Sequence, residues 1–166
     1  MNKSFLRLIF SDIIHDLNKP IFKNLESKYD IIFDSGSVEH VFSIEKALRN
    51  FVSMLKPRGL IIQHSPIDMI DHGYYNFTAE LFEDFFTVNN FEIKFSSYIT
   101  WYHHSLGKEE KFYYVQKPRT PFVSKHPSSF FSSYFGCFSN LSKIDFQIPQ
   151  QGYYSSLWTR EQSEMK

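Results

Sequence analysis

The sequence predicts an α/β fold with a partly parallel sheet, and three features of residues 29–66 support this prediction. An apolar run, Ile31-Ile32-Phe33, stops at polar residues, as a buried parallel strand does at its carboxyl end. Apolar residues then recur at helical spacing, and a second apolar run starts at Leu60. Strand, helix and strand in this order form a βαβ unit, so we expect residues 30–33 to pair in parallel with residues 60–63.

Local patterns assign the elements within and just before this unit. Residues 20–28 are expected to form a loop or short helix that leads into the strand at 29–33. The helix after this strand has one continuous apolar stripe, made of Ile44, Ala47, Leu48, Phe51, Val52 and Leu55. Pro57 and Gly59 are expected to end the helix before the next strand begins.

Beyond the unit, apolar residues at helical spacing predict another helix at about 79–89, followed by a turn at Asn89-Asn90. Residues 91–101 and 111–116 are predicted to be strands, and together they would form an antiparallel hairpin at one edge of the sheet.

The composition changes after this hairpin. Residues 118–140 are rich in serine and aromatic residues and carry almost no charge after His126, so we expect an irregular cap there. This change divides the chain into a domain at residues 1–117 and an aromatic and Ser-rich extension at residues 118–166 that packs on it.

Charge and cysteine content exclude several classes of function. Eighteen basic and eighteen acidic residues give a formal net charge of zero, which argues against a general nucleic-acid binder or an anionic-membrane binder. The single cysteine, Cys137, excludes an intrachain disulfide and a Cys-rich zinc site and fits a reducing compartment. No apolar run is long enough to span a bilayer, so we expect a soluble cytoplasmic protein.

Two short motifs give the chain a resemblance to a known family. The first is the strand with its Ser-Val-Glu-His-Val exit, at residues 29–41, and the second is Met-Leu-Lys-Pro-Arg-Gly-Leu, at residues 54–60. In type and separation they resemble the second half of a class I S-adenosylmethionine-dependent methyltransferase of the type 11 group. Residues 12–117 can be aligned in this way. The resemblance implies S-adenosylmethionine as cofactor and a small molecule or glycan precursor as methyl acceptor.

The chain also departs from the family pattern. Family members have a Gly-x-Gly-x-Gly turn after their first strand, whereas none of the six glycines here lies within two residues of another. On this interpretation the chain starts after the first two strands. The expected fold is therefore a partial Rossmann-like methyltransferase sheet with an antiparallel edge hairpin, lacking the first strands.

The resemblance implies a cofactor site. Family members place an Asp near the adenine at the end of the third strand, a place that Asp16 and Leu17 would take here. The rim of the pocket, facing the amino acid part of the cofactor, would consist of Asp34, Ser35, Gly36 and Ser37. The alternative for these four residues is a solvated strand-to-helix turn capped by Ser or Asp.

Residues for acceptor binding and catalysis follow the same two strands. His40 is the candidate base, because an imidazole can take a proton from a hydroxyl or amine near neutral pH. The residues expected at the acceptor are Glu39, His64, His72, Tyr74 and Tyr75. The alternatives are that Glu39 and His40 cap the helix and that residues 64–75 form an ordinary polar loop. A related quinone-pathway branch binds a divalent metal with a further Glu where this chain has Gly36, so no metal site is expected.

Three functions remain open on the sequence. The first is methyl transfer, and the second is a non-catalytic methyltransferase-like remnant or subunit that needs a partner. The third is an aromatic-rich binding module using Tyr74, Tyr75, Tyr153, Tyr154 and Trp158. The missing glycine turn favours the second for the isolated chain, and the lack of a basic stripe weighs against the third. An unpaired edge of Ile and Phe at residues 29–33 predicts dimerisation, aggregation or pairing with a partner chain.

Overall fold

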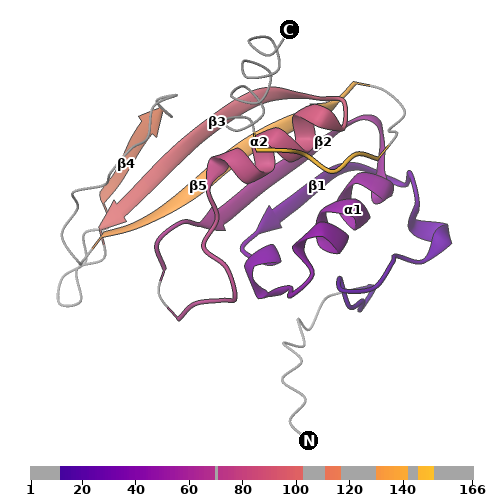
Figure 1. Cartoon of the computed structure of the whole chain (residues 1–166), viewed down its shortest axis with the longest axis horizontal. Coiled ribbons are helices and arrows are strands. Elements are labelled where there is room, and N and C mark those ends of the chain that lie inside the picture. Colours follow the sequence, from indigo (N-terminus) through magenta and orange to yellow (C-terminus); the bar gives the residue numbers. More distant parts are fainter. Residues whose placement is uncertain (1–11, 70, 103–110, 117–129, 142–145, 152–166) are drawn as a thin grey trace, which may run out of the picture.

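A mixed five-stranded sheet organises the protein (Figure 1). The structure is a computed structural model, and it describes residues 12–69, 71–102, 111–116, 130–141 and 146–151. Along the sheet the strand order is β1-β2-β5-β3-β4. The strands are β1 (Tyr29–Ser35), β2 (Leu55–Pro66), β3 (Phe91–Tyr102), β4 (Lys111–Gln116) and β5 (Phe130–Asn140). The predicted α/β class is thus confirmed, with a sheet that is partly parallel and partly antiparallel.

The predicted parallel pairing is present. β1 and β2 run parallel, with Ile31 opposite Leu60 and Phe33 opposite Ile62. The connection between them contains the 3-10 helix η2 (Val38–His40) and the helix α1 (Ile44–Met54), as the apolar stripe predicted. The loop or short helix expected before β1 contains the 3-10 helix η1 (Lys23–Leu25).

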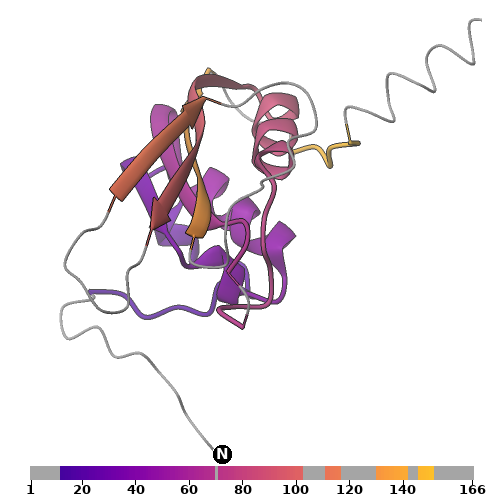
Figure 2. The ribbon, with the colours of Figure 1, turned by 90° about the vertical axis from the view of Figure 1, so that its left-hand side faces the viewer.

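Both α-helices lie on the same side of the sheet, as the view in Figure 2 shows. The second of them, α2 (Ala79–Val88), matches the helix predicted at 79–89. The core fills the space between helices and sheet and is rich in phenylalanine, with Phe82, Phe86 and Phe138 fully buried. The rings of Phe86 on α2 and Phe138 on β5 have centroids 4.3 Å apart, so helix and sheet are in direct contact there.

Two predictions about the strands need correction. The Lys-Pro-Arg-Gly sequence does not separate helix from strand, because β2 already begins at Leu55 and runs through it. Arg58 has a φ of 67° and the register with β1 is irregular at this point, so the strand accommodates Pro57 as a local distortion. Gly59 is required by a close approach, since a Cβ there would lie 2.9 Å from the carbonyl oxygen of Asp30.

The second correction concerns the expected cap. Residues 130–140 form β5, a strand inside the sheet that pairs antiparallel with β2 on one side and with β3 on the other. The predicted β3–β4 antiparallel pair is present and β4 is the outer strand, but the hairpin joins the rest of the sheet through β5. Residues 118–129 of the expected cap lie outside the described part of the chain.

β1 forms the opposite edge of the sheet within the described residues. Its side chains alternate, so Ile32 and Asp34 turn toward the helices while Ile31 and Phe33 turn to the other face. Ile31 is 57% exposed and Phe33 is 62% exposed. The edge strand thus presents two large apolar side chains beside unpaired backbone groups. None of the described helices has the length and apolar character needed to cross a bilayer.

Candidate functional site

Polar side chains gather where the two parallel strands end. η2 follows β1 after two residues, and the loop at residues 67–78 follows the carboxyl end of β2. In open α/β sheets ligands bind beyond the carboxyl ends of parallel strands. The residues of these two segments therefore define the candidate site.

Gly36 makes the sharp turn out of β1. Its φ is +83°, a conformation that residues with a Cβ rarely adopt, and its backbone N–H donates to the carbonyl of His64 at 2.9 Å. A Cβ built on Gly36 would lie 3.0 Å from Oε1 of Glu39. The turn at Gly36 thus places the backbone of residue 36 next to the carboxylate of Glu39.

Glu39 is fully buried and fixed between two loops. Its side chain has no solvent exposure, and neither carboxylate oxygen has a hydrogen-bond partner. On the backbone side, Glu39 accepts a hydrogen bond of 2.7 Å from the N–H of Tyr74, and a Cβ on Gly73 would lie 2.8 Å from the same carbonyl oxygen. Burial raises the pKa of the Glu39 carboxyl, and the charge of Asp34 raises it further, while His40 and His72 oppose the shift.

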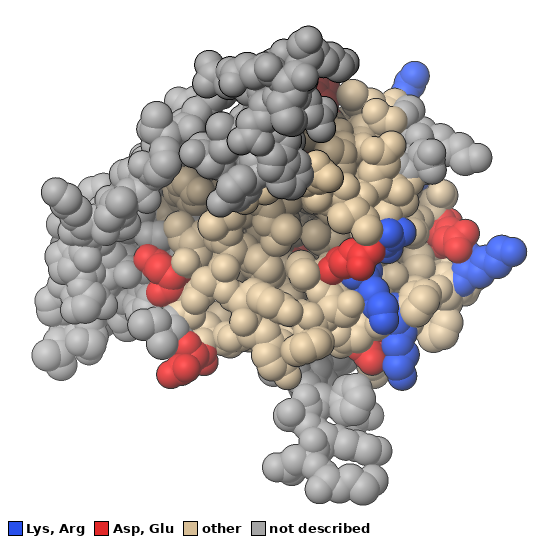
Figure 3. Space-filling view, viewed as in Figure 1, with Lys and Arg blue, Asp and Glu red and all other residues tan. Residues whose placement is uncertain are grey.

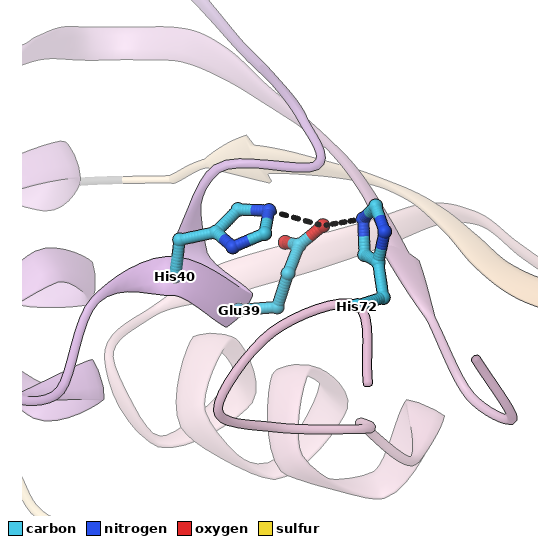
Figure 4. Close-up of side chains that lie close together, drawn as sticks. All are labelled: Glu39, His40 and His72. Carbon is cyan, nitrogen blue, oxygen red and sulfur yellow. Dashed lines mark ion pairs between the residues drawn. The ribbon is translucent and has the colours of Figure 1, made fainter. Parts of the chain in front are cut away.

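Two histidines face this carboxylate from different segments. Nε2 of His40, on η2, lies 3.9 Å from Oε1 of Glu39, and Nε2 of His72, in the loop after β2, lies 3.5 Å from the same oxygen. Figure 4 shows Glu39 between the two imidazoles, whose ring centroids are 5.1 Å apart. Both histidines remain partly exposed, so they form the side of the site that faces solvent. We call Glu39, His40 and His72 the Glu39 cluster.

The structure places the four predicted rim residues in two different environments. The carboxylate of Asp34 is buried and satisfied internally, accepting from the backbone N–H of Ser37 at 3.0 Å and from Nε2 of Gln63 at 2.5 Å. Burial raises the pKa of the Asp34 carboxyl, although these hydrogen bonds partly offset the effect. Ser35 and Ser37 are exposed, and Gly36 is partly exposed, so these three face outward from the strand end.

Asp16 and Leu17 lie in a segment that is anchored to α1. Oδ1 of Asp16 accepts from the backbone and side-chain nitrogens of Asn18, and these bonds hold the pKa of the exposed Asp16 carboxyl below its usual range. The carbonyl of Leu17 accepts from Nδ2 of Asn50 at 3.1 Å. Oδ1 of Asn18 accepts from the N–H of Ser43, just before α1, so this segment reaches the same end of the unit as η2.

The predicted acceptor residues do not all come together. His72 joins Glu39, whereas His64 is outside the Glu39 cluster, because side-chain alternation along β2 directs it away from the face that holds Gln63. Burial lowers the pKa of the His64 imidazole, opposed by the charge of Asp34.

The two predicted tyrosines take different roles. Tyr75 is structural, since its hydroxyl donates to the carbonyl of Phe42 at 2.7 Å and its ring stacks on Phe77. Tyr74 is largely exposed and meets the exposed ring of Phe42 edge to face, with centroids 5.9 Å apart. Phe42 and Tyr74 thus present an exposed aromatic pair whose members adjoin His40 and His72 in the sequence.

Two residues that position the site were not predicted. Asn50 fixes residues 17–21 to α1 through three hydrogen bonds, and Gln63 joins Asp34 to the hydroxyl of Ser65. A polar residue on the apolar side of a helix or buried strand indicates such a role, since buried polar groups are nearly always hydrogen-bonded. That signal was present in the sequence at both positions.

Comparison with protein-family models, with curated proteins and with solved structures found no match to this chain. The site must therefore be interpreted from its own geometry.

The surface charge agrees with the composition. On the face seen in Figure 3, the basic side chains of the described residues lie mainly on the right-hand side with acidic side chains beside them, and further acidic side chains lie on the left.

Proposed function

We propose that this chain takes part in methyl transfer from S-adenosylmethionine to a small molecule or glycan precursor. The observation that carries the proposal is the parallel β1–α1–β2 unit, whose two strand ends deliver a glycine turn, a buried carboxylate and two histidines to one place. This is where the two sequence motifs that resemble class I methyltransferases predicted the cofactor and the acceptor.

The described residues fit the cofactor in part. Ser35, Gly36 and Ser37 are accessible at the end of β1 and suit the amino acid part of the cofactor, and the turn at Gly36 allows a close approach of backbone to ligand. Asp34 does not fit that role, because its carboxylate is already used by Ser37 and Gln63. Asp16 remains exposed at the same end of the unit, where an adenine would require a polar partner.

The chain's own chemical task is to position the acceptor and to remove its proton. S-adenosylmethionine supplies a methyl group that is already activated by its positive sulfur, so catalysis rests mainly on alignment. The exposed pair of Phe42 and Tyr74 offers apolar contact area for the acceptor. His40 accepts the proton that the acceptor hydroxyl or amine loses, and the carboxylate of Glu39, at 3.9 Å, stabilises the resulting imidazolium.

A second candidate function is a subunit that works only with a partner chain. The exposed edge of β1 favours it, because Ile31 and Phe33 are open to another strand or another chain. The third function, an aromatic binding module, lacks comparable support. Of its five aromatic residues, three lie outside the described part of the chain (Tyr153, Tyr154 and Trp158), and Tyr75 has a structural role.

Calorimetric titration of the folded chain with S-adenosylmethionine tests the proposal. We expect saturable binding that weakens at least tenfold in a Ser35→Ala/Ser37→Ala double variant, since the loss of a single hydrogen bond to a charged group already costs about 1.5 kcal/mol. Ser53→Ala, an exposed serine of α1, is the matched control and should bind like wild type. Absence of heat with folded wild-type protein would contradict cofactor binding by this chain alone and would direct the search to a partner.

A further inference from the structure

Both carboxylate oxygens of Glu39 are buried and have no hydrogen-bond partner. A carboxylate removed from water loses several kcal/mol of solvation unless a cation or hydrogen-bond donors replace the water. Glu39 has no exposure and no hydrogen-bond donor at either oxygen. Two glycines leave room for Glu39, because a Cβ on Gly36 would lie 3.0 Å from Oε1 and a Cβ on Gly73 would lie 3.0 Å from Cγ.

The two histidines supply the second observation. Both direct Nε2 at the same oxygen of Glu39, and the three candidate ligand atoms lie within 4.8 Å of one another (Figure 4). Zinc binds nitrogen and oxygen ligands at about 2.1 Å, which places tetrahedral ligand atoms about 3.4 Å apart. The oxygen-to-nitrogen distances of 3.5 and 3.9 Å are close to that spacing, and all three atoms lie within 4.8 Å, so an ion would draw the two partly exposed imidazoles toward each other.

We propose that Glu39, His40 and His72 bind one divalent transition-metal ion of the zinc class. Two imidazole nitrogens and one carboxylate favour such ions over Mg²⁺ and Ca²⁺, which prefer oxygen ligands. Three protein ligands leave at least one coordination position open, and the partial exposure of both imidazoles leaves that position accessible from solvent. Open sites of this kind are typical of metals that take part in binding or catalysis rather than in structure alone.

This site differs from the one that the sequence excluded. That exclusion rested on Gly36, at a position where a carboxylate ligand was needed. Here Gly36 gives room to the carboxylate of Glu39, and His72, 33 residues further along the chain than Glu39, completes the set. A second pair of histidines in the sequence, His103-His104, lies outside the described residues.

The inference does not depend on methyl transfer, because it rests on the Glu39 cluster alone. If the chain both transfers methyl groups and binds a metal ion, the ion changes the roles of the site residues. His40 is then a ligand and no longer the proton acceptor, and an acceptor hydroxyl loses its proton more readily because it is held by the cation.

Metal titration of the full chain tests the proposal. After treatment with a chelator and its removal, the protein is titrated with ZnCl₂ by calorimetry and with CoCl₂ by absorption spectroscopy. We expect one ion per chain and the visible absorption bands of Co²⁺ in a low-symmetry site. Zinc should also raise the melting temperature, because an ion that binds only the folded state stabilises it.

Variants separate this site from other histidines. Glu39→Gln and His72→Gln should each weaken binding at least tenfold, whereas His15→Gln, on the segment before η1, should bind like wild type. Glu39→Gln keeps the side-chain volume, and His72→Gln changes a partly exposed loop residue, so both should fold, as circular dichroism will check. Lack of saturable binding, or binding at one equivalent that survives both substitutions, would overturn the proposal.

Discussion

The carboxylate of Glu39 occupies the space that a side chain at Gly36 would need. A Cβ at Gly36 would lie 3.0 Å from Oε1 of Glu39, at a φ of +83°. The tight turn after β1 is therefore the feature that keeps the carboxylate buried at the strand end. Any change at residue 36 acts on the Glu39 cluster as well as on the backbone.

Gly36→Ala should destabilise the protein by about 1–3 kcal/mol, from backbone strain together with the new contact to Glu39. Urea unfolding gives the difference in the free energy of unfolding. Gly36→Asn is the informative companion, because Asn tolerates positive φ but introduces the same Cβ. A smaller loss for Asn than for Ala would assign the difference to strain, and an unchanged midpoint for Ala would contradict the turn geometry.

Glu39→Gln should stabilise the metal-free protein at neutral pH by on the order of 1 kcal/mol, since it removes a buried charge whose oxygens have no hydrogen-bond donor. The same substitution should abolish any stabilisation by zinc. Thermal unfolding with and without zinc measures both effects. Glu26→Gln, at an exposed position between η1 and β1, is the control and should lack the stabilising effect. A loss of metal-free stability in Glu39→Gln would mean that the carboxylate already has a favourable partner.

The stability of the fold should fall as pH rises above the ordinary Asp pKa of 3.8, because burial raises the pKa of Asp34 in the folded state. Between the unfolded and the folded pKa the folded state binds more protons than the unfolded state, so each rise in pH favours unfolding. The contribution is fully present below 3.8 and is lost as pH passes the folded pKa. Urea midpoints across pH should show a shallower fall for Asp34→Asn, and an identical slope would refute this assignment.

The pure protein should associate through the β1 edge. Light scattering after size-exclusion chromatography should show dimers or larger species, and Phe33→Lys should shift them to monomer by placing a charge on the edge strand. Phe42→Lys is the matched control, because Phe42 is also largely exposed but lies outside the sheet. A sharp monomer peak for the wild type would remove the basis for the partner-dependent candidate function.

The β1–α1–β2 unit could be predicted from the sequence, because the apolar patterns that define each of its elements lie within short stretches of residues. The apolar run at Ile31-Ile32-Phe33 and the apolar stripe of α1 each lie within a few consecutive residues, so a short window of sequence contains the signal. The position of Glu39 and His40 after β1 followed from the same unit. That His72 faces Glu39 did not follow, since it depends on the path of an irregular loop fixed by contacts at Gly73 and Tyr74.

The strand β5 could not be predicted in the same way. Its residues alternate poorly, with Ser132-Ser133 and Gly136 among aromatic side chains, and its partners β2 and β3 precede it by many residues. Pairing across such distances is decided by the fit of backbone edges and of rings such as Phe138 against Phe86, which no short window of sequence contains. Leu55 is a similar case: it continues the apolar stripe of α1 in the sequence, but it belongs to β2 because it pairs with Tyr29 of β1.

The central place of β5 has a consequence for how the chain is made. During synthesis, β2 and β3 are complete long before residues 130–140 leave the ribosome, so the sheet stays divided into two parts with open inner edges. The closing step is the insertion of a late strand between two early ones, a non-local event of high contact order that is expected to be slow. Nascent chains stalled before residue 130 should accordingly be the species that chaperones bind most.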